Sequence, residues 1–282
     1  MIDLHVHSTI SDGMDSPKEI VKKAKTIGLT AVALTDHNCI EGLKEAKREA
    51  NKLGITFING IELSVSYGNG RQLHILGLGI DPEETNFKKS YLTYKQSRHD
   101  QINYSILELN KLGIYPKPHE LDAISTDGFL DRQTLAKWLV INGYTKSIPS
   151  SWIEYLDHYP HIEGELIDIA TALDMIKSAG GKSFMAHYHK QIGLLGYDEE
   201  ECHDILSELK SLGLDGLERY YSDYNALDHK KLDEYIETHD FITSGGSDYH
   251  GSNRPSVELG SGTDSLSVPD KLLNPISEFA YE

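Results

Sequence analysis

Residues 1–13 read MIDLHVHSTISDG, a short apolar run that carries two histidines and then gives way to small and polar residues. The alternation from Ile2 to Val6 predicts a strand. Residues two apart in a strand point to the same face, so His5 and His7 project together, with Cα atoms roughly 6–7 Å apart. The following residues have loop composition, which places Asp12 just past the strand end. A lone His-x-His pair more often marks ordinary half-buried strand residues, so its meaning depends on the rest of the chain.

The rest of the chain repeats this arrangement, because several short apolar runs end in residues that can bind a metal. Together with the first stretch, these runs supply six imidazoles and three carboxylates: His5, His7, Asp12, His37, Glu62, His74, His187, Asp248 and His250. Mixed nitrogen and oxygen ligands suit Zn, Mn or Fe. Four ligands hold one ion, and nine hold three if a carboxylate bridges. Without metal or partners, burying so many polar groups would carry a large desolvation cost.

Composition indicates a globular protein whose excess charge is negative. The 282 residues are 39% hydrophobic and 25% charged, which allows one large domain or a domain with an insertion. With 27 basic and 44 acidic residues the net charge is −17, which excludes a protein that grips nucleic acid by bulk charge.

Cysteine usage and hydropathy favour a cytoplasmic protein. Two cysteines, Cys39 and Cys202, cannot form a disulfide framework, which fits a reducing compartment. Cys39 lies two residues from His37; its position favours a small buried thiol, and a metal-ligand role is the alternative. We find no apolar run approaching about 18 residues and no signal-peptide layout.

Strands and helices alternate along most of the chain, which predicts parallel βα units. Helices are expected over residues 17–27, 41–53, 166–178, 199–212 and 225–238; strands over 30–35, 55–58, 182–187, 214–218 and 241–244; a hairpin over 63–67 and 72–78; and a last helix over 268–281. The rhythm lapses from residue 85 to residue 165, where only helical patterns occur. We therefore expect a barrel domain of residues 1–84 and 166–282 and an inserted, mostly helical cap domain of residues 85–165.

About seven strands with helices between them favour a closed or nearly closed α/β barrel. In such barrels the chemistry lies at the carboxyl ends of the strands. These ends are where most of the ligand-type residues fall, namely His5, His7, His37, Glu62, His187, Asp248 and His250, whereas His74 lies on the returning strand of the hairpin. Glu218 also stands at an expected strand end, where it positions the site. A doubly wound open sheet is the alternative, and it also places ligands at strand ends.

The joint pattern resembles the motifs of the PHP (polymerase and histidinol phosphatase) superfamily. The resemblance rests on His5-Val-His7-Ser with Asp12-Gly, Leu34-Thr-Asp36-His37-Asn, Gly60-Ile-Glu62, His74, Ala186-His187 and Gly246-Ser-Asp248-Tyr-His250. It implies a distorted (β/α)7 TIM-like barrel with a trinuclear metal centre. The implied sites are His5, His7, Glu62 and Asp248 for one ion; Glu62, His74 and His187 for a second; and Asp12, His37 and His250 for a third.

Within the superfamily, the chain is most similar to stand-alone phosphoesterases with an inserted helical domain. That resemblance implies that Arg132, in the insertion, binds substrate phosphate; a surface salt bridge at a helix start is the alternative. Where relatives read Ala-His-Pro, this chain reads Ala186-His187-Tyr-His189-Lys190. His189 and Lys190 either contact the substrate phosphate or face solvent.

The implied reaction is hydrolysis of a phosphate ester by a metal-bridging hydroxide, with Arg132 on the phosphoryl oxygens and His189 or His250 as proton donor. The expected substrate is a small nucleotide, either a nucleoside monophosphate or a 3′,5′-bisphosphate. A ribose 1,2-cyclic phosphate, histidinol phosphate and a short nucleic-acid end are alternatives. From other classes, a non-catalytic metal-binding scaffold and an amidohydrolase remain open.

Overall fold

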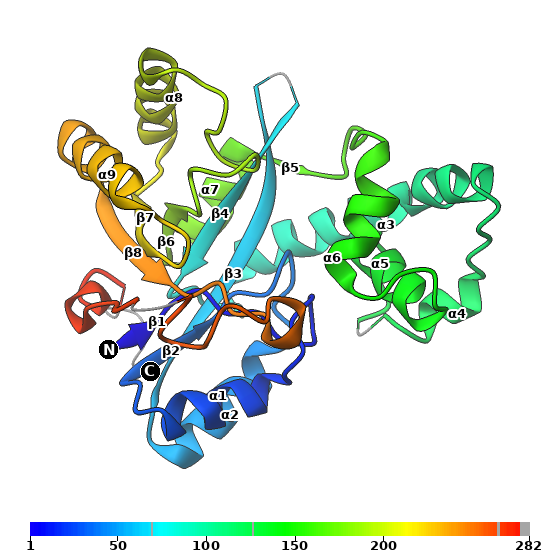
Figure 1. Cartoon of the computed structure of the whole chain (residues 1–282), viewed down its shortest axis with the longest axis horizontal. Coiled ribbons are helices and arrows are strands. Elements are labelled where there is room, and N and C mark those ends of the chain that lie inside the picture. Colours follow the sequence, from blue (N-terminus) through cyan, green and yellow to red (C-terminus); the bar gives the residue numbers. More distant parts are fainter. Residues whose placement is uncertain (69, 126, 264–265, 277–282) are drawn as a thin grey trace. The chain divides into compact units, whose positions relative to one another are not determined.

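The computed structural model of the chain describes residues 1–68, 70–125, 127–263 and 266–276 (Figure 1). It divides into two compact units, residues 1–88 with 168–282, and residues 89–167. We call the first the barrel unit and the second the helical unit. None of the described helices is both long enough and apolar enough to cross a lipid bilayer.

A sheet of seven successive strands forms the barrel unit within the described residues. Their order is β1 (Ile2–Asp3), β2 (Ala31–Leu34), β3 (Thr56–Tyr67), β4 (Arg71–Leu78), β6 (Lys182–Met185), β7 (Gly216–Tyr221) and β8 (Ile242–Gly246). Pairing is antiparallel on both sides of β4 and parallel elsewhere along this path.

The two ends of this path meet, so the sheet is a nearly closed barrel. The Leu4 N–H donates to the Gly245 carbonyl at 3.1 Å, and the Asp248 N–H donates to the His5 carbonyl at 2.8 Å. A parallel bridge also joins Val6 to Tyr249. The predicted (β/α)7-type barrel is confirmed.

Helices cover the outside of the barrel (Figure 1). They are α1 (Pro17–Thr26), α2 (Leu43–Leu53), α7 (Ile169–Ser178), α8 (Glu199–Leu212) and α9 (Ala226–His239). Two short 3-10 helices follow β8: η2 (Gly251–Asn253) and η3 (Asp270–Leu273), whose Leu272 packs in the core. Local sequence sets the starts of the α-helices: Ser16 and Glu19 form a capping box ahead of Pro17. Inside, apolar strand residues such as Ile2, Ile58 and Phe184 form the fully buried core.

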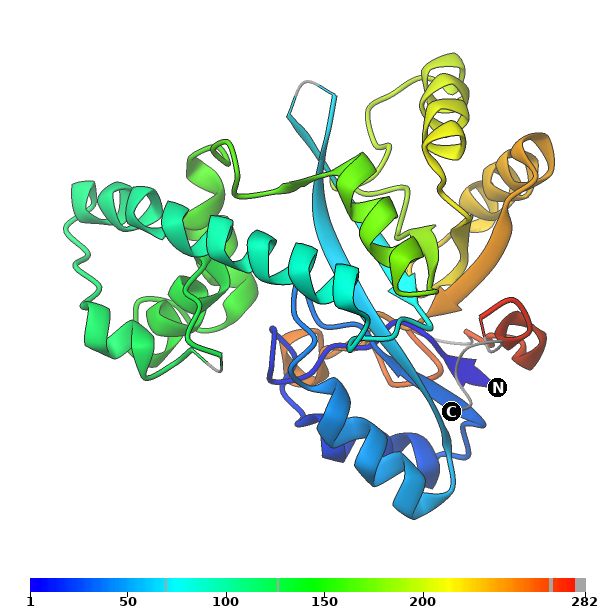
Figure 2. The same ribbon diagram turned by 180° about the vertical axis from the view of Figure 1, so that it is seen from behind.

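Strand β3 differs from the sequence-based expectation. We expected separate strands over residues 55–58 and 63–67, but Thr56–Tyr67 is one continuous strand (Figure 2). Its first part pairs with β2 and its second part with β4. Gly60 allows this change of partner, because a Cβ there would lie 2.9 Å from the Leu34 carbonyl oxygen. Glu62 therefore projects from within a strand rather than from a strand end.

Two further expectations need correction at the ends of the chain. Strand β1 ends at Asp3 rather than Val6. The expected last helix over 268–281 is represented, in the described residues, only by η3; residues 277–282 lie outside them.

The helical unit has its own apolar core. Helix α3 (Thr85–Lys111) leads into it, followed by α4 (Pro118–Asp122), α5 (Arg132–Ile141), α6 (Ile148–Glu154) and η1 (Leu156–His158). The boundary between the two units falls within β5 (Ile167–Asp168), which pairs with β3. Leu109, Leu121, Leu135 and Leu156 are fully buried together. The helical unit spans residues 89–167, whereas the sequence predicts an inserted domain of residues 85–165.

Candidate metal centre

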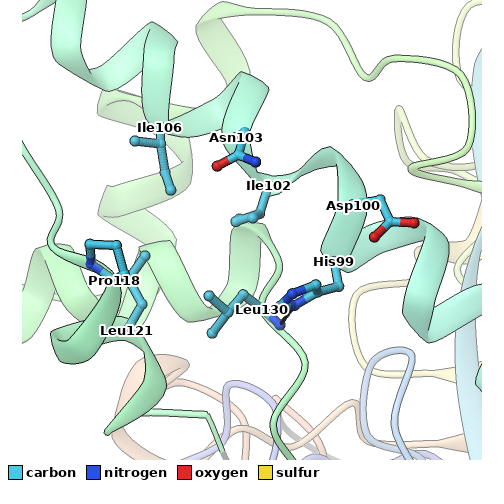
Figure 3. A pocket seen from close by; sticks show the side chains of 8 residues that line it. All are labelled: His99, Asp100, Ile102, Asn103, Ile106, Pro118, Leu121 and Leu130. Carbon is cyan, nitrogen blue, oxygen red and sulfur yellow. Dashed lines mark hydrogen bonds between the residues drawn. The ribbon is translucent and has the colours of Figure 1, made fainter.

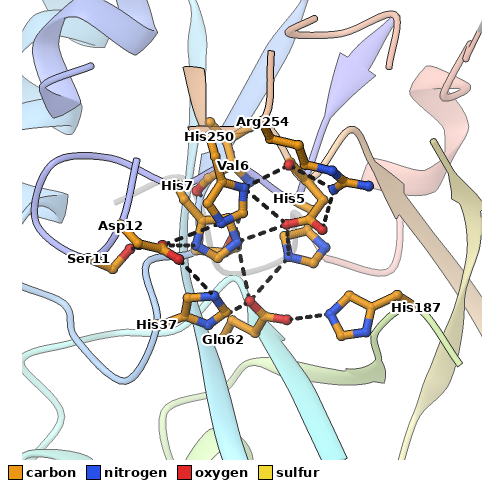
Figure 4. A network of polar contacts seen from close by, with 12 residues as sticks. His5, Val6, His7, Ser11, Asp12, His37, Glu62, His187, His250 and Arg254 are labelled. Atoms are coloured by element: carbon orange, nitrogen blue, oxygen red, sulfur yellow. Dashed lines mark hydrogen bonds and ion pairs between the residues drawn. The ribbon is translucent and has the colours of Figure 1, made fainter. Parts of the chain in front are cut away.

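Glu62 is the centre of a polar cluster inside the barrel (Figure 4). Its Oε1 lies 2.9 Å from Nδ1 of His74 and 2.9 Å from Nε2 of His187. Its Oε2 lies 2.9 Å from Nδ1 of His37, 3.2 Å from Nε2 of His7 and 3.3 Å from Nε2 of His5. One fully buried carboxylate thus faces five imidazoles, a geometry suited to a bridging ligand.

Two more carboxylates complete the cluster. Oδ1 of Asp248 lies 3.3 Å from Nε2 of His7, and Oδ1 of Asp12 lies 3.4 Å from Nε2 of His250. The structure therefore brings together all nine residues that the sequence singles out as ligand types.

The ligand atoms form overlapping sets that lie within 4.8 Å of one another. The sets are His7 with Asp12, His37 and His250; His5 with His187 and Asp248; His5 with His7 and Glu62; and His37 with Glu62 and His74. The first set contains the implied third site and adds His7. His37 appears in two sets, so it lies between the implied second and third sites.

Strand ends and strained turns aim these side chains. His37 follows β2 and pairs with Glu62 across a parallel bridge. His187 and Asp248 follow β6 and β8 with positive φ values of 29° and 57°. Non-glycine residues seldom adopt this backbone conformation, and such strain often accompanies functional sites.

Several buried polar atoms of the cluster lack a hydrogen bond among the described residues. They are Nε2 of His5, both ring nitrogens of His7, Nδ1 of His37, Oε2 of Glu62 and Nδ1 of His187. Buried polar atoms are nearly always hydrogen-bonded, because leaving them unpaired costs free energy. Converging lone pairs of nitrogen and oxygen are the donor set of a first-row divalent cation, so the residues fit a metal centre.

The pKa values of the cluster's side chains shift in different directions. Burial acts to raise the pKa of Glu62, but His37 and His5 outweigh it and hold that pKa well below its usual value. Burial acts to lower the pKa of His37, but Glu62 and Asp12 raise it to about 9. Burial lowers the pKa of His187 to about 3, which keeps this imidazole neutral, as a metal ligand must be.

Groups behind the cluster orient its imidazoles. Glu218 is fully buried; its Oε1 lies 2.8 Å from Nδ1 of His5, and its Oε2 accepts the His187 N–H at 2.8 Å. Asp36, which sequence reasoning did not assign, accepts the hydroxyls of Ser8 and Ser11 at 2.7 and 2.6 Å and so shapes the loop before Asp12. Its only sequence signal is its place beside a ligand-type histidine.

The outer oxygen of Asp248 is held by Tyr221 and Arg254, which the sequence motifs do not include, and lies near Lys190. Its Oδ2 accepts from the Tyr221 hydroxyl at 2.8 Å and from Nη1 of Arg254 at 2.6 Å, and Nζ of Lys190 lies 3.6 Å away. The carboxylate therefore faces imidazoles with one oxygen and two cations with the other.

His189 lies among aromatic rings. Its ring centroid is 5.0 Å from that of Tyr224 and 5.7 Å from that of Tyr221. In the part of the chain that the structure describes, no hydrogen bond or ion pair joins its ring to a side chain of the nine. Burial lowers its pKa, which favours the neutral ring. Its role as phosphate contact and proton donor stays a prediction.

Arg132 is the first residue of α5 and only 3% exposed. Its guanidinium donates to the carbonyls of Leu156, Tyr159 and Pro160 at 2.9, 3.2 and 2.7 Å and to Glu165 at 2.9 Å. It is thus a buried ion pair within the helical unit, not a surface salt bridge. Its predicted contact with substrate phosphate stays a prediction and would require some of these bonds to be exchanged.

The helical unit also contains a cavity of about 280 Å³ (Figure 3). Apolar side chains form most of its wall, and His99 is fixed there because its Nδ1 accepts the Leu130 N–H at 2.9 Å. Its lining is His99, Asp100, Ile102, Asn103, Ile106, Pro118, Leu121 and Leu130. It contains none of the nine ligand-type residues.

Comparison with known proteins finds a family profile and several relatives that match most of the chain. A family profile described as PHP domain matches residues 3–238. The chain is 32% identical to a 5′-3′ exoribonuclease of Haemophilus influenzae, covering 88% of this chain and 89% of that protein. It is 28% identical to a 3′,5′-nucleoside bisphosphate phosphatase of Chromobacterium violaceum (92% and 90% covered) and 29% identical to a phosphoribosyl 1,2-cyclic phosphate 1,2-diphosphodiesterase of Eggerthella lenta (88% and 94%).

Solved structures agree with the fold. A Chromobacterium violaceum structure, described as an amidohydrolase with bound sulfate and no metal, superposes with a TM-score of 0.77 at 29% identity, covering 92% of this chain and 89% of that one. A structure from Bifidobacterium adolescentis superposes with a TM-score of 0.83 at 22% identity, covering 100% and 96%. The second likeness concerns the fold alone.

Proposed function

Since the chain belongs to the PHP domain family and is a metal-dependent phosphoesterase, we propose that its substrate is a small nucleotide, with a nucleoside 3′,5′-bisphosphate or monophosphate as the first choice. The observation that carries this proposal is the buried cluster centred on Glu62, in which nine ligand-type side chains converge. The similar proteins named above act on phosphate esters of ribose compounds, which supports the same substrate class.

The proposed cofactor is three divalent ions of Mn, Zn or Fe. His5, His7, Glu62 and Asp248 would hold one ion; Glu62, His74 and His187 a second; Asp12, His37 and His250 a third. When bound, such ions lower the pKa of water and neutralise charge on phosphoryl oxygens.

The chain's own residues supply orientation and protonation state. Glu218 accepts from Nδ1 of His5, which leaves Nε2 of that ring with its lone pair toward Glu62. Burial lowers the pKa of His187 and so keeps its ring neutral. Nε2 of this ring lies 2.9 Å from Oε1 of Glu62. Tyr221 and Arg254 fix Asp248 from outside, so that its Oδ1 stays directed at the imidazoles.

Charge favours a small substrate over a long polyanion. The net charge of −17 repels the backbone of a nucleic acid at a distance. A single nucleotide carries few charges, and a metal cluster offsets them locally.

A second candidate is removal of nucleotides from the 5′ end of a short RNA. The observation in its favour is the 32% identity to a 5′-3′ exoribonuclease over most of both chains. This activity would use the same cluster of ligand-type residues. The two candidate substrates differ only in the number of nucleotides attached to the phosphate.

The test is phosphate or nucleotide release from a substrate panel by Mn²⁺-loaded protein. The panel contains adenosine 3′,5′-bisphosphate, AMP, ribose 1,2-cyclic phosphate, histidinol phosphate, a 5′-phosphorylated RNA pentamer and an N-acyl amino acid as amidohydrolase substrate. We expect the bisphosphate or AMP to be hydrolysed at least tenfold faster than each of the remaining four compounds, as judged by kcat/KM.

Glu62→Gln is the control for background activity, because it keeps the shape but removes the bridging charge. Preference for the pentamer would transfer the assignment to the exoribonuclease. Turnover of the amide alone, or of nothing, would overturn the proposed function.

A further inference from the structure

Lys190 stands at the edge of the metal centre, in the loop after β6. Its Nζ donates to the Tyr221 hydroxyl, lies 3.6 Å from Oδ2 of Asp248 and lies 4.9 Å from the centroid of the Tyr221 ring. Its side chain is 32% exposed, whereas that of Asp248 is 7% exposed. The lysine thus connects a buried member of the cluster to solvent.

Arg254 shares the same acceptor, but its charge is already matched by two carboxylates. Nη1 donates to Oδ2 of Asp248 at 2.6 Å and to the Asp248 carbonyl at 3.2 Å, and Nη2 donates to Asp223. This guanidinium bridges two carboxylates, so its charge is matched. We regard Arg254 as a positioning residue that acts through Asp248.

Lys190 has donors to spare. An ammonium group carries three N–H donors. Within the described ranges, Nζ makes one hydrogen bond, to Tyr221, and the nearest carboxylate oxygen is 3.6 Å away and already accepts from Tyr221 and Arg254. Up to two donors are therefore available to a ligand at the open side of the site.

The chemistry of that ligand follows from its neighbours. Lys190 is a cation with free N–H donors, and it lies beside Asp248, a carboxylate that faces the imidazoles. This position suits an anion that binds Lys190 with one oxygen and reaches the metal centre with its other oxygens. The hydroxyl and the ring face of Tyr221 hold the ammonium in place, which lowers the entropy cost of using it. Phosphate oxygens are strong acceptors for such a donor.

We propose that Lys190, held by Tyr221, binds the phosphoryl oxygens of the substrate. This inference rests on the proposed function and adds a specificity-determining residue to it. A terminal phosphate monoester is a dianion and a cyclic diester a monoanion, so an added cation favours the monoester. Lys190 therefore accounts for discrimination between the two classes of phosphate ester.

The test measures binding of inorganic phosphate to Mn²⁺-loaded protein by calorimetry, which requires no turnover. Lys190→Met should weaken phosphate binding at least tenfold with unchanged metal content, and Lys190→Arg should restore most of it. Tyr221→Phe, which keeps the ring and removes the hydroxyl, should weaken binding by a smaller factor. Lys210→Met is the matched control, because Lys210 also lies 4.9 Å from an aromatic centroid, that of Phe241. Among the described residues, Lys210 has no hydrogen bond or ion pair with a member of the cluster, so the phosphate affinity of this variant should stay within twofold of the parent.

Three results would overturn the inference: less than fivefold weakening in Lys190→Met, loss of metal in that variant, or no measurable phosphate binding by the metal-loaded parent. Absence of turnover on the substrate panel, with phosphate binding still dependent on Lys190, would instead count against the proposed substrate and leave Lys190 as an anion contact. The ratio of kcat/KM for monoester over cyclic diester gives a second reading, which should fall at least fivefold in Lys190→Met.

Discussion

Nδ1 of His5 lies 2.8 Å from Oε1 of Glu218, and both side chains are fully buried. Because Glu218 is only an acceptor when ionised, this contact assigns the proton of His5 to Nδ1 and directs the lone pair of Nε2 toward Glu62 and Asp248. Partners behind a metal-bound histidine commonly change metal affinity by 10–100-fold.

We therefore expect Glu218→Gln to weaken metal binding by about 10–100-fold while keeping the fold. Competition with a fluorescent chelator measures this affinity. Glu237→Gln, on the exposed face of α9, is the control and should bind metal as the parent does. Equal affinity in Glu218→Gln and the parent would show that His5 needs no such support.

Removing the metal should lower the thermal stability of the barrel unit. A ligand that binds only the folded state stabilises it by about 4 kcal/mol at a concentration 1,000 times its Kd. Added Mn²⁺ should raise the Tm of chelator-treated protein in a calorimetric scan, and the rise should be mostly absent in Glu62→Gln. A Tm independent of Mn²⁺ in the parent would contradict a cofactor bound by buried ligands.

Arg132→Met should destabilise the helical unit, because it removes the guanidinium paired with the buried Glu165 and leaves, among the described residues, only the His161 side chain beside that carboxylate. Breaking a buried ion pair in this way costs roughly 3–5 kcal/mol, which urea denaturation can measure. The double variant Arg132→Met with Glu165→Leu removes both charges and should recover most of that loss.

The same double variant tests whether Arg132 also binds phosphate. If it does, the recovered protein should keep a raised KM for the bisphosphate. If KM returns to the parent value together with stability, Arg132 serves the fold alone.

Asp131 should contribute stability that depends on pH. Burial acts to raise its pKa, but Arg98 and Lys95 outweigh it and lower the pKa from 3.8 to about 2. A lowered pKa in the folded state means that the carboxylate stabilises the fold above pH 4 and loses this effect as pH falls toward 2. The shift corresponds to about 2–3 kcal/mol.

Asp131→Asn isolates this charge, because asparagine can still cap α5. The variant should lose about 2–3 kcal/mol in urea unfolding at pH 7, and the difference should narrow between pH 4 and pH 3. Asp168→Asn is the control, since Asp168 caps α7 from an exposed position; it should change stability by a few tenths of a kcal/mol. A constant difference across this range would assign the effect to shape rather than charge.

The barrel fold and the convergence of the nine ligand-type residues could be predicted from the sequence, because both follow from the order of strands and loops along the chain. An apolar run followed by a loop places a side chain at a strand end, and parallel strand ends meet at one face of a barrel. Glu62 was found by its type and spacing, although Thr56–Tyr67 turned out to be one strand. The change of partner at Gly60 depends on packing against Leu34, which local periodicity does not report.

The surroundings of the cluster were less accessible, because they depend on contacts between distant loops. Tyr221 and Arg254 are 27 and 6 residues from Asp248, and neither spacing has a recognisable pattern. The burial of Arg132 likewise depends on three carbonyl groups more than 20 residues away. An arginine at a helix start looks the same in sequence whether it meets solvent, phosphate or a buried glutamate.

A crystal structure of the Mn²⁺-loaded protein, with anomalous scattering recorded near the manganese edge, would show directly whether Glu62 bridges bound metal ions. We expect three anomalous peaks around Glu62, each about 2.0–2.3 Å from its ligand nitrogen and oxygen atoms. A map with no anomalous peak within 3 Å of Glu62 in metal-loaded crystals would contradict this expectation.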